Sequence, residues 1–205
     1  MALCGFASLR PIRTKSGTLR RAVGAREPID AFGNQPFRED GAMRFWLLDA
    51  IRSYEPGIEL TATKNVALSE EYLADHFPEF PVLPGVFMLE ASTQAAAWLL
   101  RLSEDFAHSI VCLKEAKNIK YADFVPPGQT LSVTVSMVKQ ADRLATFKVE
   151  GQMGDRPTLS GRLVIERYNL AESDPAQRST DEDLKNYFRQ VAQLLLPREL
   201  ALPVR

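Results

Sequence analysis

The stretch that decides the fold is His76–Gln94, HFPEFPVLPGVFMLEASTQ. Its prolines each hold φ near −65° and stiffen the chain up to Pro84-Gly85. Pro is tolerated at the start of a helix, because the missing N–H would have no partner there. From Pro84 to about Leu102 the side chains are apolar nearly all round. This segment therefore predicts a helix that is enclosed by protein.

After this helix the spacing of apolar residues changes from the helical period to alternation, which is typical of strands. Residues 58–68, before the helix, begin with the same alternation, and 69–83 are expected to be a loop. Further strands are predicted over roughly 109–121, 130–139, 143–151 and 158–168. One buried helix followed by consecutive strands predicts an α+β fold with an antiparallel sheet curled around the helix.

The two ends of the chain differ from this central part. In the segment 1–42, six basic residues lie within the first 26 positions, and no acidic residue precedes Glu27. Such a segment is typical of a flexible arm, an organelle transit peptide, or a sequence upstream of a true start at Met43. Residues 169–205 are predicted to be a polar linker and an amphipathic helix, with Thr180 as N-cap and Asp183 three positions on. The expected domain is therefore 43–168, between a basic arm and a C-terminal helix.

Composition excludes several classes of protein. With 45% hydrophobic and 25% charged residues, the chain resembles an ordinary globular protein. A net charge of −1 provides no field that would attract nucleic acid or a membrane. The apolar stretch 84–100 is short and interrupted by polar residues, which favours a buried helix over a membrane span. Cys4 and Cys112 lack metal-ligand spacing, so we expect free thiols, a reducing compartment and no metal.

The central helix carries the residues that suggest chemistry. Glu90 and Gln94 are four apart and share one helix face. A carboxyl in apolar surroundings is costly unless it is paired, protonated or used. His76 stands on the proline-braced loop, and the amides near Gly85 could stabilise an oxyanion. Taken singly, Glu90 could be a satisfied buried group and His76 a structural histidine, as His108 is expected to be. Together they suit proton abstraction next to a thioester, with a neutral His and a protonated Glu.

The pattern His-Phe-Pro-x-x-Pro-x-x-Pro-Gly-Val, with Glu fourteen residues after the His and Gln four further on, resembles the signature of β-hydroxyacyl-acyl-carrier-protein dehydratases. The similarity extends from about Met43 to Arg167. The family implies a hot-dog fold with active sites at a dimer interface, where His of one subunit faces Glu of the other. It also implies a substrate on the phosphopantetheine of an acyl carrier protein, no metal or dissociable cofactor, and a homodimer or a trimer of dimers.

The resemblance also implies roles for individual residues. His76 would remove the α-proton and Glu90 would protonate the departing hydroxyl, in reversible dehydration of a (3R)-3-hydroxyacyl thioester to the trans-2-enoyl product during fatty acid elongation. The other implied roles are a carbonyl-polarising amide at Gly85, support of Glu90 by Gln94, and an acyl tunnel lined by Phe77, Val86 and Phe87.

One departure from the family lies next to the histidine. Asp75 replaces the usual Gly, and its negative charge would favour the protonated imidazole and weaken His76 as a base. The alternatives to the dehydratase are a hot-dog thioesterase, a dehydratase that also isomerises the double bond, and a non-catalytic protein that binds acyl carrier protein. A cytoplasmic protein is expected, or an imported one if residues 1–42 are a transit peptide.

Overall fold

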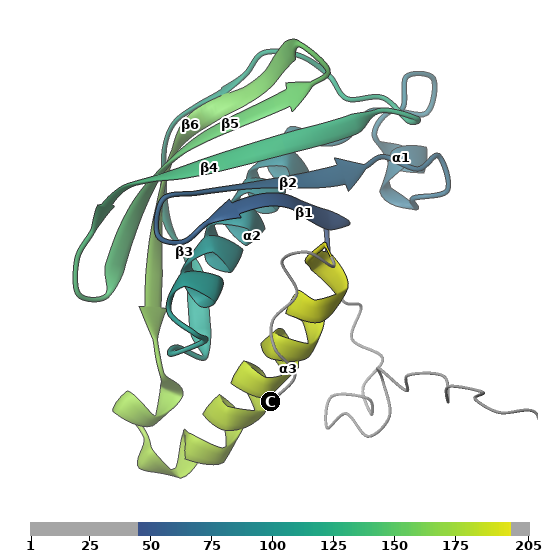
Figure 1. The fold of residues 1–205 in the computed structure, drawn as a ribbon. Helices are drawn as coiled ribbons and strands as arrows, with labels where there is room; N and C mark the ends of the chain where they lie inside the picture. Colours follow the sequence, from purple (N-terminus) through teal and green to yellow (C-terminus); the bar gives the residue numbers. More distant parts are fainter. Residues whose placement is uncertain (1–44, 198–205) are drawn as a thin grey trace, which may run out of the picture. The chain divides into compact units, whose positions relative to one another are not determined.

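The computed structural model describes residues 45–197 and builds them around a single antiparallel sheet (Figure 1). The sheet has six strands in the order β1-β2-β4-β5-β6-β3. The strands are β1 (Ala50–Glu55), β2 (Glu59–Asn65), β3 (Ile110–Tyr121), β4 (Thr130–Gln140), β5 (Leu144–Met153) and β6 (Arg156–Tyr168). The helices are α1 (Tyr72–Asp75), α2 (Gly85–Ser103) and α3 (Arg178–Leu195). The predicted α+β class, with a curled sheet around one long helix, is confirmed.

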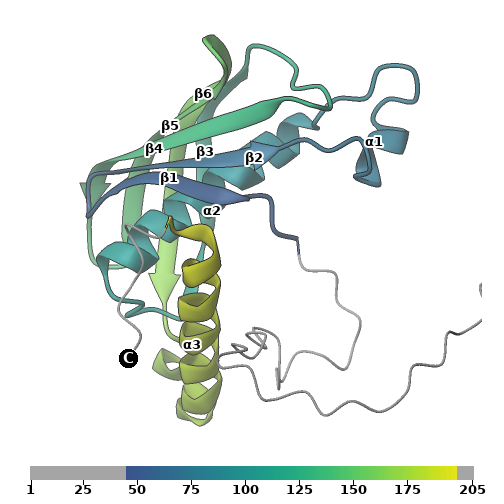
Figure 2. The same cartoon turned by 45° about the vertical axis from the view of Figure 1, so that its right-hand side comes forward.

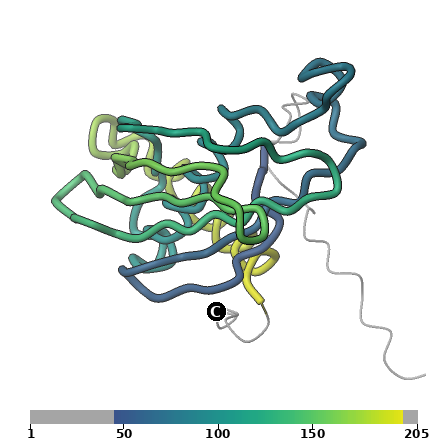
Figure 3. The backbone as a smooth tube through the Cα atoms, turned by 90° about the horizontal axis from the view of Figure 1, so that it is seen from above, coloured from purple at the N-terminus to yellow at the C-terminus, as the bar shows by residue number. Residues whose placement is uncertain are grey.

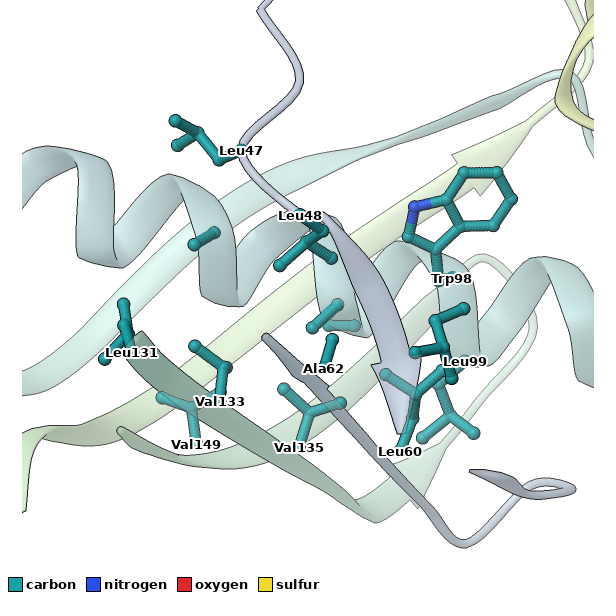
Figure 4. Packing of buried hydrophobic residues seen from close by; sticks show 14 of the residues in the cluster. Leu47, Leu48, Leu60, Ala62, Trp98, Leu99, Leu131, Val133, Val135 and Val149 are labelled. Atoms are coloured by element: carbon teal, nitrogen blue, oxygen red, sulfur yellow. The ribbon is translucent and has the colours of Figure 1, made fainter. Parts of the chain in front are cut away.

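The core forms where the sheet wraps α2. Alternate residues of β2 and β4, such as Leu60 and Val133, are fully buried and point toward the helix (Figure 4). On α2 they meet Trp98 and Leu99, which are also fully buried. Burying a side chain of this size stabilises the fold by about 1.5–3 kcal/mol. The alternation that predicted the strands is therefore the same pattern that holds α2 in place.

The two edge strands of the sheet, β1 and β3, differ in length (Figure 3). β1 is short and pairs with β2, with a register shift between Ile51 and Ser53. β3 has 12 residues, pairs with β6 on one side only, and is exposed along most of its length. An edge strand of this kind offers unpaired backbone groups to another chain.

The structure differs from the sequence-based expectations at three places. No strand was predicted before residue 58, where the structure has β1, and the predicted loop 69–83 contains the short helix α1. The prediction of Thr180 as N-cap is wrong, since α3 begins at Arg178 after Gln177. The physical reason lies just upstream: Asp174 accepts a hydrogen bond from the amide of Ala176, and the resulting 3₁₀ turn Pro175–Gln177 leads directly into the helix.

The C-terminal helix α3 lies on the side of α2 away from β4–β6 (Figures 1 and 2). Asp181, in the first turn of α3, is only 2% exposed and attaches the helix to the residues before it and to the domain. The carboxylate accepts hydrogen bonds from the amides of Leu170 (2.8 Å) and Ala171 (2.9 Å) and from the hydroxyl of Ser109. The predicted linker is thus ordered in the structure. The predicted basic arm, residues 1–42, lies outside the described residues. Between residues 45 and 197, no helix is long and apolar enough to cross a membrane.

Candidate active site

His76 follows α1 and is held at both its backbone and its ring. Its amide donates to the carbonyl of Tyr72, and its carbonyl accepts from the amide of Val82. Its Nδ1 lies 3.0 Å from the carbonyl oxygen of Val82. Because a carbonyl can only accept, the contact assigns the proton of the neutral ring to Nδ1. The lone pair on Nε2 is therefore available to take a proton from a substrate.

A hydrogen-bonded cluster behind the histidine fixes the loop to β2. The side chain of Lys64, which is buried, lies 2.9 Å from Glu70, and the second oxygen of Glu70 accepts from the hydroxyl of Tyr72. Burial alone would raise the pKa of Glu70, but the bonds from Tyr72, Lys64 and the amide of Ala67 lower it overall. The cluster anchors α1, and α1 in turn carries His76.

His76 opens onto a hollow of about 300 Å³ at the N-terminus of α2. The predicted site residues Phe77 and Gly85 line the same hollow. The first amides of a helix have no partner within it, so the N-terminus of α2 presents donors beside the histidine. A Cβ on Gly85 would lie 3.1 Å from the ring of Tyr121, another residue of this hollow. A larger residue at this position would therefore press on that ring, which would have to shift by a few tenths of an ångström.

Glu90 lies on a different face of α2 from Gly85, which borders the His76 hollow. It is hydrogen-bonded to Gln94, the pairing that the sequence predicted. The Nε2 of Gln94 donates to Glu90 at 2.9 Å and to the carbonyl of Phe45 at 2.9 Å. The Oε1 of Gln94 accepts from the amide of Leu47 at 3.1 Å. Gln94 is therefore fixed by the segment that precedes β1, and it holds the Glu90 carboxyl from one side.

Glu90 borders a second, larger hollow of about 420 Å³. This hollow follows one face of α2 through Thr93, Gln94, Ala97, Trp98 and Arg101. Its other walls come from the segment before β1, from the start of β3 and from α3, as Phe45, Trp46, Val111, Cys112, Leu113, Tyr187 and Phe188. The hollow is mainly aromatic and aliphatic, with Glu90 and Arg101 as its charged residues.

Within one chain the candidate base and acid are not brought into a common hollow. The hollow at His76 and the hollow at Glu90 share no lining residue. The two predicted tunnel residues on the first turn of α2 lie in neither: Val86 is 64% exposed, and Phe87 packs on Phe45 at 4.9 Å between ring centres. Asp75 is exposed at the end of α1, where water screens its charge.

Two residues of these hollows were missed by the sequence interpretation. Arg101 stands eleven residues after Glu90, a spacing that returns to the same helix face and could have been noticed. Tyr121 reaches the His76 hollow from the end of β3, a long-range contact with no local sequence signal. In the part of the chain that the structure covers, no group of three or more His, Cys, Asp or Glu residues is arranged to hold a metal ion.

Comparison with known proteins identifies the family of the chain. The ApeI-like family, described as ApeI dehydratase, matches residues 53–162. The 3-hydroxyacyl-acyl-carrier-protein dehydratase FabZ of Levilactobacillus brevis is 38% identical over 118 residues, which are 58% of this chain and 80% of that protein. The enzyme of the same name from Clostridium kluyveri is 33% identical over 121 residues, covering 59% and 84%.

Among solved structures, the dehydratase heterocomplex ApeI:P from Xenorhabdus doucetiae matches with a TM-score of 0.53 and 18% identity. The match covers 65% of this chain and 90% of that one, and it supports the fold. The family match covers more than half of the 205 residues. The chain therefore belongs to the hot-dog-fold dehydratase family that includes the ApeI and FabZ dehydratases.

Proposed function

We propose that this protein is a lyase that reversibly dehydrates (3R)-3-hydroxyacyl-acyl carrier protein to the trans-2-enoyl thioester in fatty acid elongation. The observation that carries the proposal is the state of His76, whose Nδ1 is engaged by the Val82 carbonyl so that Nε2 is left as a base. Several FabZ relatives, named as 3-hydroxyacyl-acyl-carrier-protein dehydratases, support the same reaction.

The chemistry divides between the two residues. Nε2 of His76 takes the proton from C2 of the substrate, while the amide at Gly85 polarises the thioester carbonyl. The electron pair of the broken C2–H bond forms the C2–C3 double bond. Glu90, in its protonated form, gives its proton to the departing C3 hydroxyl, which leaves as water. Proton return from His76 to Glu90 through solvent completes the cycle.

A second copy of the chain would complete the site. His76 and Glu90 border separate hollows in one chain, so neither hollow holds both groups. Around the His76 loop, apolar side chains are exposed: Phe77 by 50%, Phe80 by 54% and Phe124 by 55%. Exposed apolar patches of this kind mark interaction surfaces. We place His76 of one subunit opposite Glu90 of the other, in a homodimer or a trimer of dimers.

The remaining residues follow from this arrangement. Gln94 orients the Glu90 carboxyl, and Phe77, Val86 and Phe87 would contact the acyl chain once the second subunit covers them. The acyl carrier protein brings the substrate on its phosphopantetheine, and the reaction uses no dissociable cofactor. The Cys112 thiol is free, which fits a reducing compartment such as the cytoplasm.

The test is an assay of hydration of a trans-2-enoyl-acyl carrier protein, in which the rate is measured as the loss of the enoyl thioester absorbance. His76→Asn and Glu90→Gln keep the side-chain shape and should each lower kcat by roughly 10²–10⁴-fold, as loss of a general acid or base does. His108→Asn and Glu79→Gln are the matched controls, since His108 pairs with Glu104 and Glu79 is exposed. Full activity in either active-site variant would contradict the proposal. Release of free thiol from the acyl thioester would identify a thioesterase instead. Binding of the acyl carrier protein without turnover would identify a non-catalytic protein.

A further inference from the structure

The hollow at Glu90 extends along α2 to a second charged residue. Glu90 and Arg101 both line it, and they stand about 16 Å apart along the helix axis at 1.5 Å per residue. Ala97 and Trp98 form the wall between them, and Phe188 of α3 closes the side. The hollow therefore has an acidic end, an apolar middle and a basic end.

Among residues 45–197, Arg101 is buried without a carboxylate partner. The residue is 8% exposed, and its Nε atom is buried with no hydrogen-bond partner. None of the ion pairs formed within residues 45–197 includes it. Burial lowers the pKa of Arg101 to about 10, so the side chain still carries its charge at neutral pH. Buried charges in proteins are normally paired, because an unpaired one is costly to desolvate.

Two aromatic rings lie against the guanidinium of Arg101. Its central carbon lies 3.8 Å from the ring centre of Phe188 and 5.7 Å from that of Trp98. Such stacking fixes the orientation of the planar group and offsets part of the desolvation cost. The Nε–H, which has no partner among the described residues, is left for an acceptor. A carboxylate is one of the two groups, with phosphate, whose geometry matches the donors of an arginine.

We propose that Arg101 binds a carboxylate at the far end of the acyl chain, so that the enzyme prefers 3-hydroxyacyl thioesters that end in a carboxylate. The inference rests on the proposed function, because Glu90 fixes where the reacting carbons lie. The apolar wall at Ala97 and Trp98 would cover the methylene groups in between.

The length of the hollow limits the length of the acyl chain that reaches Arg101. Along an extended chain each bond advances roughly 1.2 Å, about a third of the rise per residue of extended backbone. The polar contacts at the two ends take up about 3 Å each, which leaves roughly 10 Å for the chain between C3 and its terminal carbon. Acyl chains of roughly eight to twelve carbons would therefore reach from the Glu90 end to the guanidinium.

The test compares three enoyl thioesters of equal length, between eight and twelve carbons, that end in a carboxylate, a carboxamide or a methyl group. The wild-type full-length enzyme should hydrate the carboxylate series with a kcat/KM about tenfold or more above the methyl series, because the methyl group leaves the guanidinium unpaired. This comparison needs no variant, so it does not depend on whether a substitution folds.

Two substitutions then locate the preference. Arg101→Met, similar in apolar bulk, should abolish the preference, so that the ratio of kcat/KM between the carboxylate and the methyl series falls to about one. Arg101→Lys retains the charge and should keep part of the preference. Arg143→Met is the matched control, since Arg143 is exposed and paired with Glu172, and it should leave all three series unchanged. Circular dichroism verifies the fold of each variant.

The outcomes separate this inference from the proposed function. Equal turnover of the three series by the wild type, or a carboxylate preference that survives in Arg101→Met, overturns the role of Arg101 and leaves the dehydratase standing. No turnover of any series overturns the proposed function and the inference with it.

Discussion

Replacement of Asp181 by alanine should loosen α3 from the domain. The substitution removes an acceptor of three hydrogen bonds, from Ser109, Leu170 and Ala171. Bonds to a charged group contribute about 1.5–3 kcal/mol each, but the carboxylate also loses hydration when it is buried. We therefore expect a net loss of about 3 kcal/mol in the free energy of unfolding. For a chain of this size, that loss lowers Tm by roughly 6–12 °C.

Tryptophan fluorescence during urea unfolding measures this loss. The chain has two tryptophans, Trp46 and Trp98, and both rings contact Phe188 of α3, at 6.2 and 6.0 Å between centres. Asp183→Ala is the matched control, because Asp183 is an exposed acid on the same turn of the helix. Its effect should stay within about 0.5 kcal/mol.

The same variant has a defined pH dependence. Burial alone would raise the pKa of Asp181, but the bonds from Ser109, Ala171 and Leu170 lower it overall. The stabilisation is therefore complete above the unfolded pKa of about 3.9 and is lost as the pH falls through the lower folded value. The gap between wild type and Asp181→Ala should shrink in acid. A gap that widens in acid, or equal stabilities of Asp181→Ala and Asp183→Ala at pH 7, would refute the reasoning.

Three further changes probe the site. Gln94→Leu removes the donor to Glu90, and it should lower kcat for enoyl hydration about tenfold or more with little change in KM, because the acid is then poorly oriented. Gly85→Ala places a Cβ 3.1 Å from the Tyr121 ring and should raise KM, measured by the same assay, unless that ring moves aside freely. Glu70→Gln removes the carboxylate that anchors α1, and it should speed hydrogen exchange in the loop that carries the base; unchanged exchange would refute that anchoring role.

Local periodicity was sufficient to predict much of the fold. The prolines before α2 and the apolar run after them predicted that helix to within a residue at each end, and alternation predicted β2 to β6. The order of the strands depends on long-range pairing, such as that of β3 with β6, which leaves no local signal. Asp181 could not be found for the same reason: a polar residue in the first turn of a helix is usually solvated, and only the fold shows that it is buried.

The sequence predicted individual residues of the site better than their arrangement in space. The Glu90–Gln94 pair follows from helical spacing, and the structure contains its hydrogen bond. The hollows that separate His76 from Glu90 depend on how α3 and the segment before β1 cover α2, and neither packing is visible in sequence. Arg101 shares the helix face of Glu90, but it was passed over because a basic residue in the last turn of a helix is ordinarily explained by the helix dipole.

The central claim is that His76 of one subunit works with Glu90 of another, and subunit mixing tests it most directly. His76→Asn and Glu90→Gln proteins, each inactive alone, are unfolded together, refolded and assayed for enoyl hydration. Random pairing makes half of the dimers mixed, and each mixed dimer has one intact site, so the account predicts recovery to about a quarter of wild-type activity. A mixture that associates but stays as inactive as its components would contradict the account.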